Sequence, residues 1–158
     1  MGPVARLYLA YFQRLPDFEG FQYYIGERDG GRPLAAIADE FAGSREFADR
    51  YGAVDNAGFL DRIAQNVLEG GIDPAQRAYW LAQLDSGATT RGQAMLAISE
   101  TSGFRAATDN EVFVAIAYAE TLQRAPEVAD WVRWVTFLDA GNPRGALIEE
   151  LLRTRIPG

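Results

Sequence analysis

The stretch Phe12-Gln13-Arg14-Leu15-Pro16-Asp17 decides the fold, because it returns later in the chain as Leu122-Gln123-Arg124-Ala125-Pro126-Glu127. Between the two, Leu68 and Asp73 take the places of Phe12 and Asp17 after a shift of 56 residues, with Gly70-Gly71-Ile72 in the turn. A repeat of this length is typical of proteins built from stacked supersecondary units. The sequence therefore predicts a repeat architecture.

The copies extend outward from this turn over almost the whole chain. Matching positions include Tyr24, Trp80 and Trp134 in the second segment of each copy, and Phe41, Ile98 and Leu151 in the third. One residue is gained in the loop between these segments in the second copy and lost again in the third. We predict a single domain over residues 1–158, with copies at about residues 4–54, 58–108 and 111–158.

Each copy is expected to consist of helices. From Val4 to Phe12, apolar residues recur every three or four positions, as on one face of an amphipathic helix. Asp17 and Asp73 stand where an N-cap begins the second helix, and Ser44 stands before a short fourth helix. No segment alternates as a strand does. The pattern predicts an all-α protein of three imperfect repeats, each of three to four helices, packed into one compact helical array.

The third copy stops at the place of the fourth helix. Leu151 and Thr154 reach the positions of Ile98 and Thr101. We therefore expect Leu147, Leu151 and Leu152 to form an apolar face that a neighbour covers. Either a second chain or the first copy would provide that cover, and the two alternatives stay open.

Composition narrows the function. The sequence has no cysteine and no histidine, and all fifteen basic residues are arginine. Thiolate sites, histidine-based relays and Schiff-base lysines are therefore excluded, although carboxylate chemistry remains. We expect a protein that is not an enzyme and has no cofactor. The net charge of −7 disfavours nucleic acid, and no apolar run reaches the roughly 20 residues of a membrane helix. We expect a soluble chain, and its first residues contain no signal peptide.

The motif of the first copy resembles the bacterial domain of unknown function numbered 4214. The matching residues are Arg14-Leu15-Pro16-Asp17, Gly20, Tyr23-Tyr24, Gly30-Gly31 and Ser44-Arg45-Glu46-Phe47, with Gln13 for the usual Gly and Tyr24 for Trp. The second copy keeps Asp73, Tyr79-Trp80 and Phe104, and the third keeps Arg124-Ala125-Pro126 and Trp134. The resemblance implies a helical module, often in tandem, of secreted and cell-surface bacterial proteins, distantly similar to phycobilisome linker domains. It implies attachment or assembly and no activity.

Two groups of aromatic residues are candidates for different roles. Tyr24, Trp80 and Trp134 recur at one helical position, which indicates core packing, worth roughly 2–3 kcal/mol for each ring. Tyr23, Tyr79 and Trp131 lie off that stripe. They are the candidates for exposed contacts with a ligand, with ordinary surface aromatics as the alternative.

The charged residues of the turns are also candidates. Arg14 and Arg124 share one repeat position and could bind an anion, although a contact with carbonyls or an acid explains them more simply. Asp17 and Asp73 are interpreted as helix caps, with a calcium site at Asp17 and Glu19 as the alternative. The pairs Asp39-Glu40 and Glu149-Glu150 are interpreted as solvated surface, because adjacent residues of a helix point about 100° apart.

These observations predict a non-catalytic interaction or scaffold module that docks a protein partner or self-associates. The alternative is a carbohydrate-binding module that recognises a surface or extracellular polysaccharide. We expect no nucleic-acid partner, no membrane insertion and no bound metal. The resemblance implies an extracellular or cell-surface location as part of a longer protein or assembly. The identity of the partner does not follow from the sequence.

Overall fold

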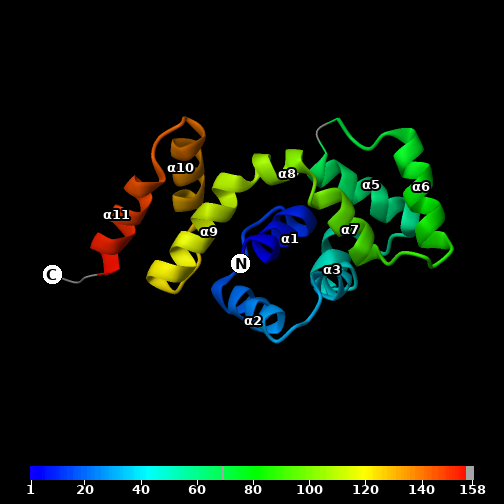
Figure 1. Cartoon of the computed structure of the whole chain (residues 1–158), viewed down its shortest axis with the longest axis horizontal. Coiled ribbons are helices and arrows are strands. Elements are labelled where there is room, and N and C mark those ends of the chain that lie inside the picture. The colour runs from blue at the N-terminus through cyan, green and yellow to red at the C-terminus, as the bar shows by residue number, and fades with distance from the viewer. Residues whose placement is uncertain (69, 156–158) are drawn as a thin grey trace.

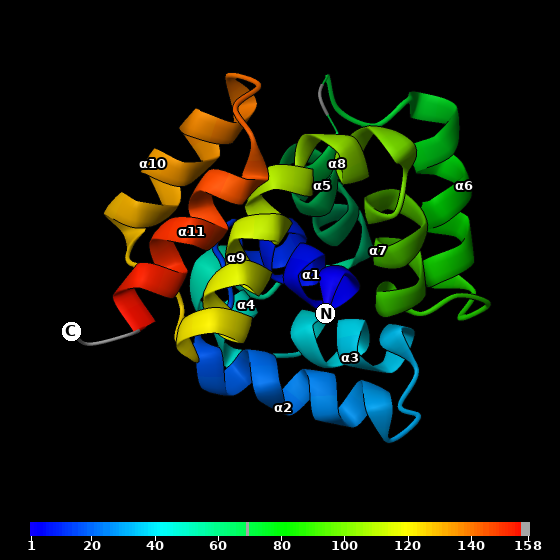
Figure 2. The same ribbon diagram turned by 60° about the vertical axis from the view of Figure 1, so that its left-hand side comes forward.

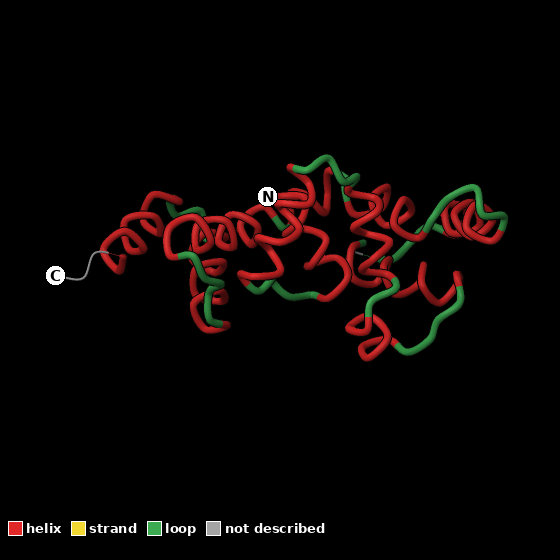
Figure 3. The backbone as a smooth tube through the Cα atoms, turned by 90° about the horizontal axis from the view of Figure 1, so that it is seen from below, coloured by secondary structure: helices red, strands yellow, loops and turns green. Residues whose placement is uncertain are grey.

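The computed structural model describes residues 1–68 and 70–155, and within these ranges it contains helices and connecting loops (Figure 3). The predicted all-α fold is confirmed. The first four helices are α1 (Gly2–Phe12), α2 (Phe18–Asp29), α3 (Leu34–Ala42) and α4 (Arg45–Tyr51). The next four are α5 (Asn56–Val67), α6 (Pro74–Asp85), α7 (Arg91–Ser99) and α8 (Ser102–Ala107). The last three are α9 (Asp109–Leu122), α10 (Val128–Asp139) and α11 (Arg144–Arg155).

Three helices, α2, α4 and α6, begin at capping residues that the sequence predicts. Asp17 accepts a hydrogen bond from the Gly20 N–H at 2.8 Å, and Asp73 accepts from Ala75 and Gln76. Ser44 accepts from the Phe47 N–H at 3.1 Å. Each acceptor satisfies an N–H group that has no partner within its own helix.

One core joins the helices of the first two predicted copies. Its largest fully buried side chains lie on α1, α2, α3, α5 and α7 and include Tyr11, Phe21, Phe59, Ile63 and Met95. Within the described residues, α3 and α7 make the most extensive contact between two helices. Figure 2 shows α3 beside α7, with α2 on the far side of α3. These two helices therefore hold the first two copies together.

A second core lies under the last three helices. Val114 and Tyr118 of α9 pack there with Trp134 of α10 and with Leu147 and Leu151 of α11. On its other side, α9 contributes Val112, Ala115 and Ala119 to the first core. Figure 1 shows α9 leading from the body of the molecule to α10 and α11, which lie at one end of the longest axis, away from α5 and α6. One helix that is apolar on two sides thus connects the two cores.

Candidate interaction surface

Two of the three aromatic candidates are exposed. Tyr23 on α2 is 55% exposed and Tyr79 on α6 is 56% exposed. Each places the edge of its ring against the ring of the next residue, Tyr24 or Trp80, with centroids 5.0 and 5.1 Å apart. Both are thus held on the protein at one side while the other side faces solvent.

The third candidate, Trp131, is not exposed as expected. It is half-buried and packs against both hydrophobic cores. The reason is its place in the repeat, because Trp131 falls on Phe21, which is buried in the first copy. The place that corresponds to Tyr79 belongs to Arg133, whose guanidinium lies 4.5 Å from the centre of the Trp134 ring. Trp131 therefore anchors α10 at the junction of the two cores.

The aromatic residues expected in the core pack there to different degrees. Trp134 is buried, whereas Tyr24 and Trp80 are half-buried at the edge of the first core. The Tyr24 hydroxyl donates to the Glu40 carboxylate at 2.8 Å, and this hydrogen bond lowers the pKa of Glu40, as does the Arg32 guanidinium. Burial and the same carboxylate raise the pKa of Tyr24. Tyr24 thus fastens α2 to α3 with both its ring and its hydroxyl.

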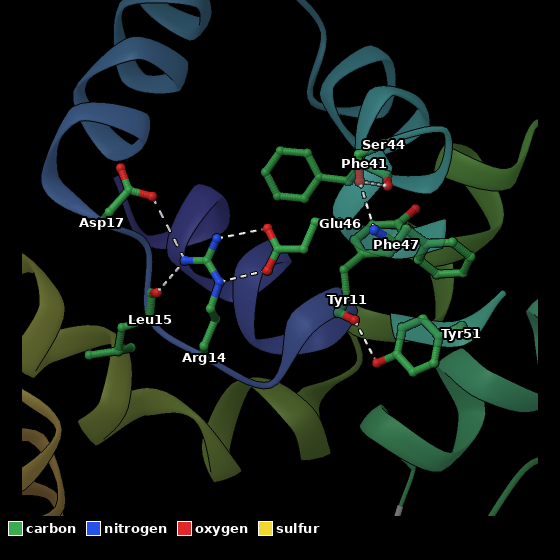
Figure 4. A network of polar contacts seen from close by, with 9 residues as sticks. All are labelled: Tyr11, Arg14, Leu15, Asp17, Phe41, Ser44, Glu46, Phe47 and Tyr51. Carbon is green, nitrogen blue, oxygen red and sulfur yellow. Dashed lines mark hydrogen bonds and ion pairs between the residues drawn. The ribbon is translucent and has the colours of Figure 1, made fainter. Parts of the chain in front are cut away.

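Arg14 lies in a polar network between α1, α2 and α4 (Figure 4). Its Nε and one terminal nitrogen donate to the two carboxylate oxygens of Glu46 at 2.7 and 2.8 Å, and its other terminal nitrogen donates to the Leu15 carbonyl. The Asp17 carboxylate lies 3.8 Å away. The hydrogen bond with Glu46 raises the pKa of Arg14, while burial and the Asp17 charge raise the pKa of Tyr8 beneath it to about 12. The Arg14 guanidinium is therefore hydrogen-bonded to groups of the protein itself, which indicates a structural role.

Arg124 repeats part of this arrangement. It donates to the Ala125 carbonyl at 3.0 Å and lies over the Tyr118 ring at 5.2 Å, as Arg14 does with Leu15 and at 5.1 Å over Tyr8. The preceding residues, Gln13 and Gln123, both have a left-handed backbone. Arg124 is exposed, and the position that corresponds to Glu46 falls on residue 156, outside the described residues. Of the two arginines, the exposed Arg124 is the more accessible to an anion.

The acidic candidate residues make different contacts in the structure. Asp17 and Asp73 cap helices, as predicted, whereas Glu127 stands at an N-cap position without accepting a side-chain hydrogen bond. Glu19 is exposed in the first turn of α2. In residues 1–68 and 70–155, no three acidic side chains come together as a metal site. Among these described residues, Asp17 and Glu19 therefore belong to no cluster of three acidic side chains.

One of the acids interpreted as solvated surface makes a partly buried contact between two helices. Asp39 of α3 accepts a hydrogen bond from the Gly92 N–H of α7 at 2.6 Å. Sequence reasoning missed this contact because its partner lies 53 residues away. Glu149, in contrast, is exposed and lies 3.5 Å from Arg153 of the same helix.

Sequence reasoning also missed a polar cluster that occurs twice. Asn56 donates to Asp85 at 2.8 Å and accepts from Arg91, whose guanidinium lies 5.0 Å from the Phe59 ring. Asn110 donates to Asp139 at 2.8 Å and accepts from Arg144, which also lies over the Phe113 ring. The signal was available, since Asn, Asp and Arg recur at matching places in the second and third copies. Each cluster ties the starts of two helices to the end of another.

The exposed apolar surface of the third copy differs from the expectation. Leu147 and Leu151 are buried against α9 and α10, so they do not need a neighbour to cover them. Leu152 of α11 is 45% exposed, and Val128 and Val132 of α10 are 71% and 57% exposed. Between α10 and α11 lies a groove of about 360 Å³, whose lining includes Arg133, Trp134, Phe137, Glu149 and Arg153. The candidate surface therefore lies on α10 and α11.

Residues 38–108 match the family described as domain of unknown function (DUF4214). This segment covers 71 of the 158 residues, so the family match describes less than half of the chain. The resemblance inferred from the motif is confirmed, although the match begins within α3 and the Arg14 turn lies outside it. Both Asp39 and Gly92 lie inside the DUF4214 match, as does all of the second copy. Searches of curated proteins and of solved structures find no match to the chain.

No helix in the described part of the chain is long and apolar enough to cross a membrane.

Proposed function

We propose that the chain is a non-catalytic helical interaction module of a secreted or cell-surface bacterial protein, which docks a protein partner or associates with itself. The observation that carries this proposal is the exposure of Val128 and Val132 on α10, with Leu152 exposed on α11. Contiguous exposed apolar surface is a feature of protein contacts, whereas single apolar residues are ordinary. Val128 and Val132 are one helical turn apart and therefore share a face of α10.

The composition supports a binding role. Without histidine, cysteine or lysine, the groove between α10 and α11 offers two arginines and two glutamates as its charged groups. Arg133 donates to Glu150 at 2.6 Å, and Arg153 lies 3.5 Å from Glu149. Charges that already pair with each other at the rim of an apolar groove suit recognition of another polypeptide better than proton transfer.

The test uses the purified chain and a double variant, Val128→Ser with Val132→Ser. Sedimentation velocity over a range of concentrations measures self-association. Cross-linking to proteins of the secreted fraction, followed by binding to each purified candidate partner, measures association with other proteins. We expect association in at least one of the two measurements. We also expect the double variant to weaken the binding of any partner that contacts α10. A chain that stays monomeric and binds no purified partner would refute the proposal.

A second function is favoured by the exposure of Tyr23 and Tyr79. An aromatic ring with one open side suits stacking against a sugar ring, so a carbohydrate-binding module remains the alternative proposal. Titration with bacterial surface polysaccharides, followed by intrinsic fluorescence, tests it. We expect Tyr23→Ala and Tyr79→Ala to weaken sugar binding with an unchanged melting temperature if this function is correct. Absence of saturable binding to every polysaccharide tested would contradict the carbohydrate-binding function.

A further inference from the structure

The pairing of α3 with α7 shows how two equivalent helices of this chain recognise each other. Ala35 and Gly92 occupy the same place in the first and second copies, and they meet at the crossing of the two helices. A Cβ atom at Gly92 would lie 2.3 Å from the Ala35 carbonyl oxygen and 2.5 Å from the Asp39 nitrogen. Only glycine permits this approach. Because equivalent residues face each other, the contact is of the isologous kind that two identical surfaces can form.

Two features stabilise the contact between α3 and α7. The Gly92 N–H, which lies in the first turn of α7 and has no acceptor within its own helix, donates to Asp39 at 2.6 Å. Beside this hydrogen bond, four small or flexible residues of the two helices are buried. They are Ala38 and Ala42 on α3 and Met95 and Ser99 on α7. An acid on one helix and a glycine on the other thus form a complementary pair.

Helix α11 carries both members of that pair. In the repeat, Gly145 takes the place of Gly92, and Glu149 takes the place of Asp39. Ile148 and Leu152 occupy the places of Met95 and Ser99. The four residues have spacings of three and four, so they share one face of the helix. A single helix therefore presents the acid of α3 together with the glycine of α7.

This face of α11 is open. Gly145, Glu149 and Leu152 are exposed and Ile148 is half-buried, whereas Gly92, Met95 and Ser99 are buried on α7. Outside its own helix and chain neighbours, no described atom lies within 4 Å of a Cβ built at Gly145. Leu147 and Leu151, on a different side of α11, pack against the second core. Ile148 packs in part against the same core, so three of the four positions of the face that pairs in the first two copies are exposed in the third.

We propose that α11 binds α11 of a second copy of this chain, in the manner in which α3 binds α7. The inference rests on the proposed function and names its partner. Across a twofold axis, each Glu149 accepts a hydrogen bond from the Gly145 N–H of the second copy. Ile148 and Leu152 of both copies pack around the crossing. Ile148 is about as large as Met95 and larger than Ala38, so two such residues add apolar contact beside the crossing.

The local chemistry of α11 favours this arrangement. Thr90 caps α7, but its counterpart before α11 is Pro143, whose side chain has no acceptor, so an acceptor from outside suits the first turn of α11. Arg153 lies 3.5 Å from Glu149 and offsets the repulsion between the two glutamates of a dimer. A single pair of helices forms a small interface, so we expect a weak and reversible dimer.

The experiment compares the chain with Gly145→Ala by sedimentation equilibrium up to millimolar concentration. We expect the chain to dimerise and Gly145→Ala to stay monomeric, because the added Cβ would meet the backbone of the second copy as it would at Gly92. The substitution faces open space in the monomer, so the melting temperature should be unchanged or slightly higher. Gly103→Ala is the matched control, since Gly103 is also the second residue of its helix and also faces open space. It should leave dimerisation unchanged.

A second variant, Glu149→Ala, removes the acceptor and should weaken the dimer at least several-fold without changing the fold measured by circular dichroism. Concentration-dependent protection from hydrogen exchange should be confined to α11. A dimer that persists in Gly145→Ala, or that is lost instead in Val132→Ser, would overturn the α11 assignment while leaving self-association in place. A strict monomer would overturn the dimer, and the proposed function would then depend on the measurements with other proteins alone.

Discussion

Helices α7 and α11 occupy the same place in two copies of one repeat. The face of α7 that carries Gly92 is covered by another helix, whereas the corresponding face of α11 is exposed. Gly92 of α7 lies against the backbone of α3, whereas Gly145 of α11 faces open space. The difference lies in the neighbours, because α7 meets α3 from the preceding copy while α11 packs on α9. A repeat position thus specifies a helix and its core face, and the order of the copies decides whether the other face is covered.

The largest effect expected from this comparison is at Gly92. Gly92→Ala would place a Cβ 2.3 Å from the Ala35 carbonyl, and neither backbone can move without separating α3 from α7. We expect a loss of about 3 kcal/mol of unfolding free energy. Gly145→Ala should have no such penalty and could gain up to ~1 kcal/mol from helix propensity. Denaturant unfolding of both variants measures the difference, and equal effects would contradict the assignment of open and closed faces.

The junction between the closed and open parts is the next place to test. Trp131 packs against both cores, so Trp131→Ala should separate the last three helices from the body and cost about 2–3 kcal/mol. Hydrogen exchange should then show faster opening of α10 and α11 than of α3 and α7. Tyr79→Ala, at an exposed aromatic residue, serves as the control and should stay within about 0.5 kcal/mol. A uniform change in exchange over all helices would show that the two cores unfold as one unit.

The sequence predicted the local part of this architecture well. Asp17, Asp73 and Ser44 cap helices as expected, because a cap depends on residues only two or three positions away. The error at Trp131 was avoidable, since Trp131 falls on Phe21 in the repeat, and Phe21 lies three residues from Tyr24 and therefore on the same helix face. In contrast, Leu147 and Leu151 were expected to need cover from a second chain or from the first copy, because the second apolar side of α9 was not recognised.

Long-range packing could not be predicted in the same way. Asp39 looks like a surface acid in the sequence, and Gly92 looks like an unfavourable glycine near the start of a helix. Only the approach of α3 to α7 explains both, and that approach depends on the positions of helices about 50 residues apart. The open face of α11 follows from the same comparison. It becomes visible once the contact between α3 and α7 is known.

A smaller effect should distinguish the two arginine turns. Arg14 contacts both carboxylate oxygens of Glu46, while Arg124 is exposed and donates to the neighbouring Ala125 carbonyl. We expect Arg14→Gln to lower the unfolding free energy by about 1 kcal/mol, since the ion pair is only partly shielded from water. Arg124→Gln should change it by less than about 0.5 kcal/mol. High salt should reduce the difference in unfolding free energy between the two variants. If that difference does not depend on salt, it arises from packing of Arg14 against Tyr8.

The smallest predicted effect concerns pH at the junction of the two cores. Burial raises the pKa of Glu111 on α9, and the Asp139 carboxylate contributes to the same shift. A raised pKa means that the folded state holds this proton more tightly than the unfolded state does. The contribution to stability is therefore complete below the ordinary carboxyl pKa and is lost as the pH rises through the folded pKa. Glu111→Gln removes that dependence, so the variant should gain stability relative to the unchanged chain as the pH rises above the ordinary carboxyl pKa of about 4. Glu120→Gln, at an exposed position of the same helix, should show no such gain.

Thermal unfolding as a function of pH measures the stability of both variants. If the two variants behave alike, the junction is open to water, and the connection between the closed and open parts of the molecule is looser than its buried residues indicate.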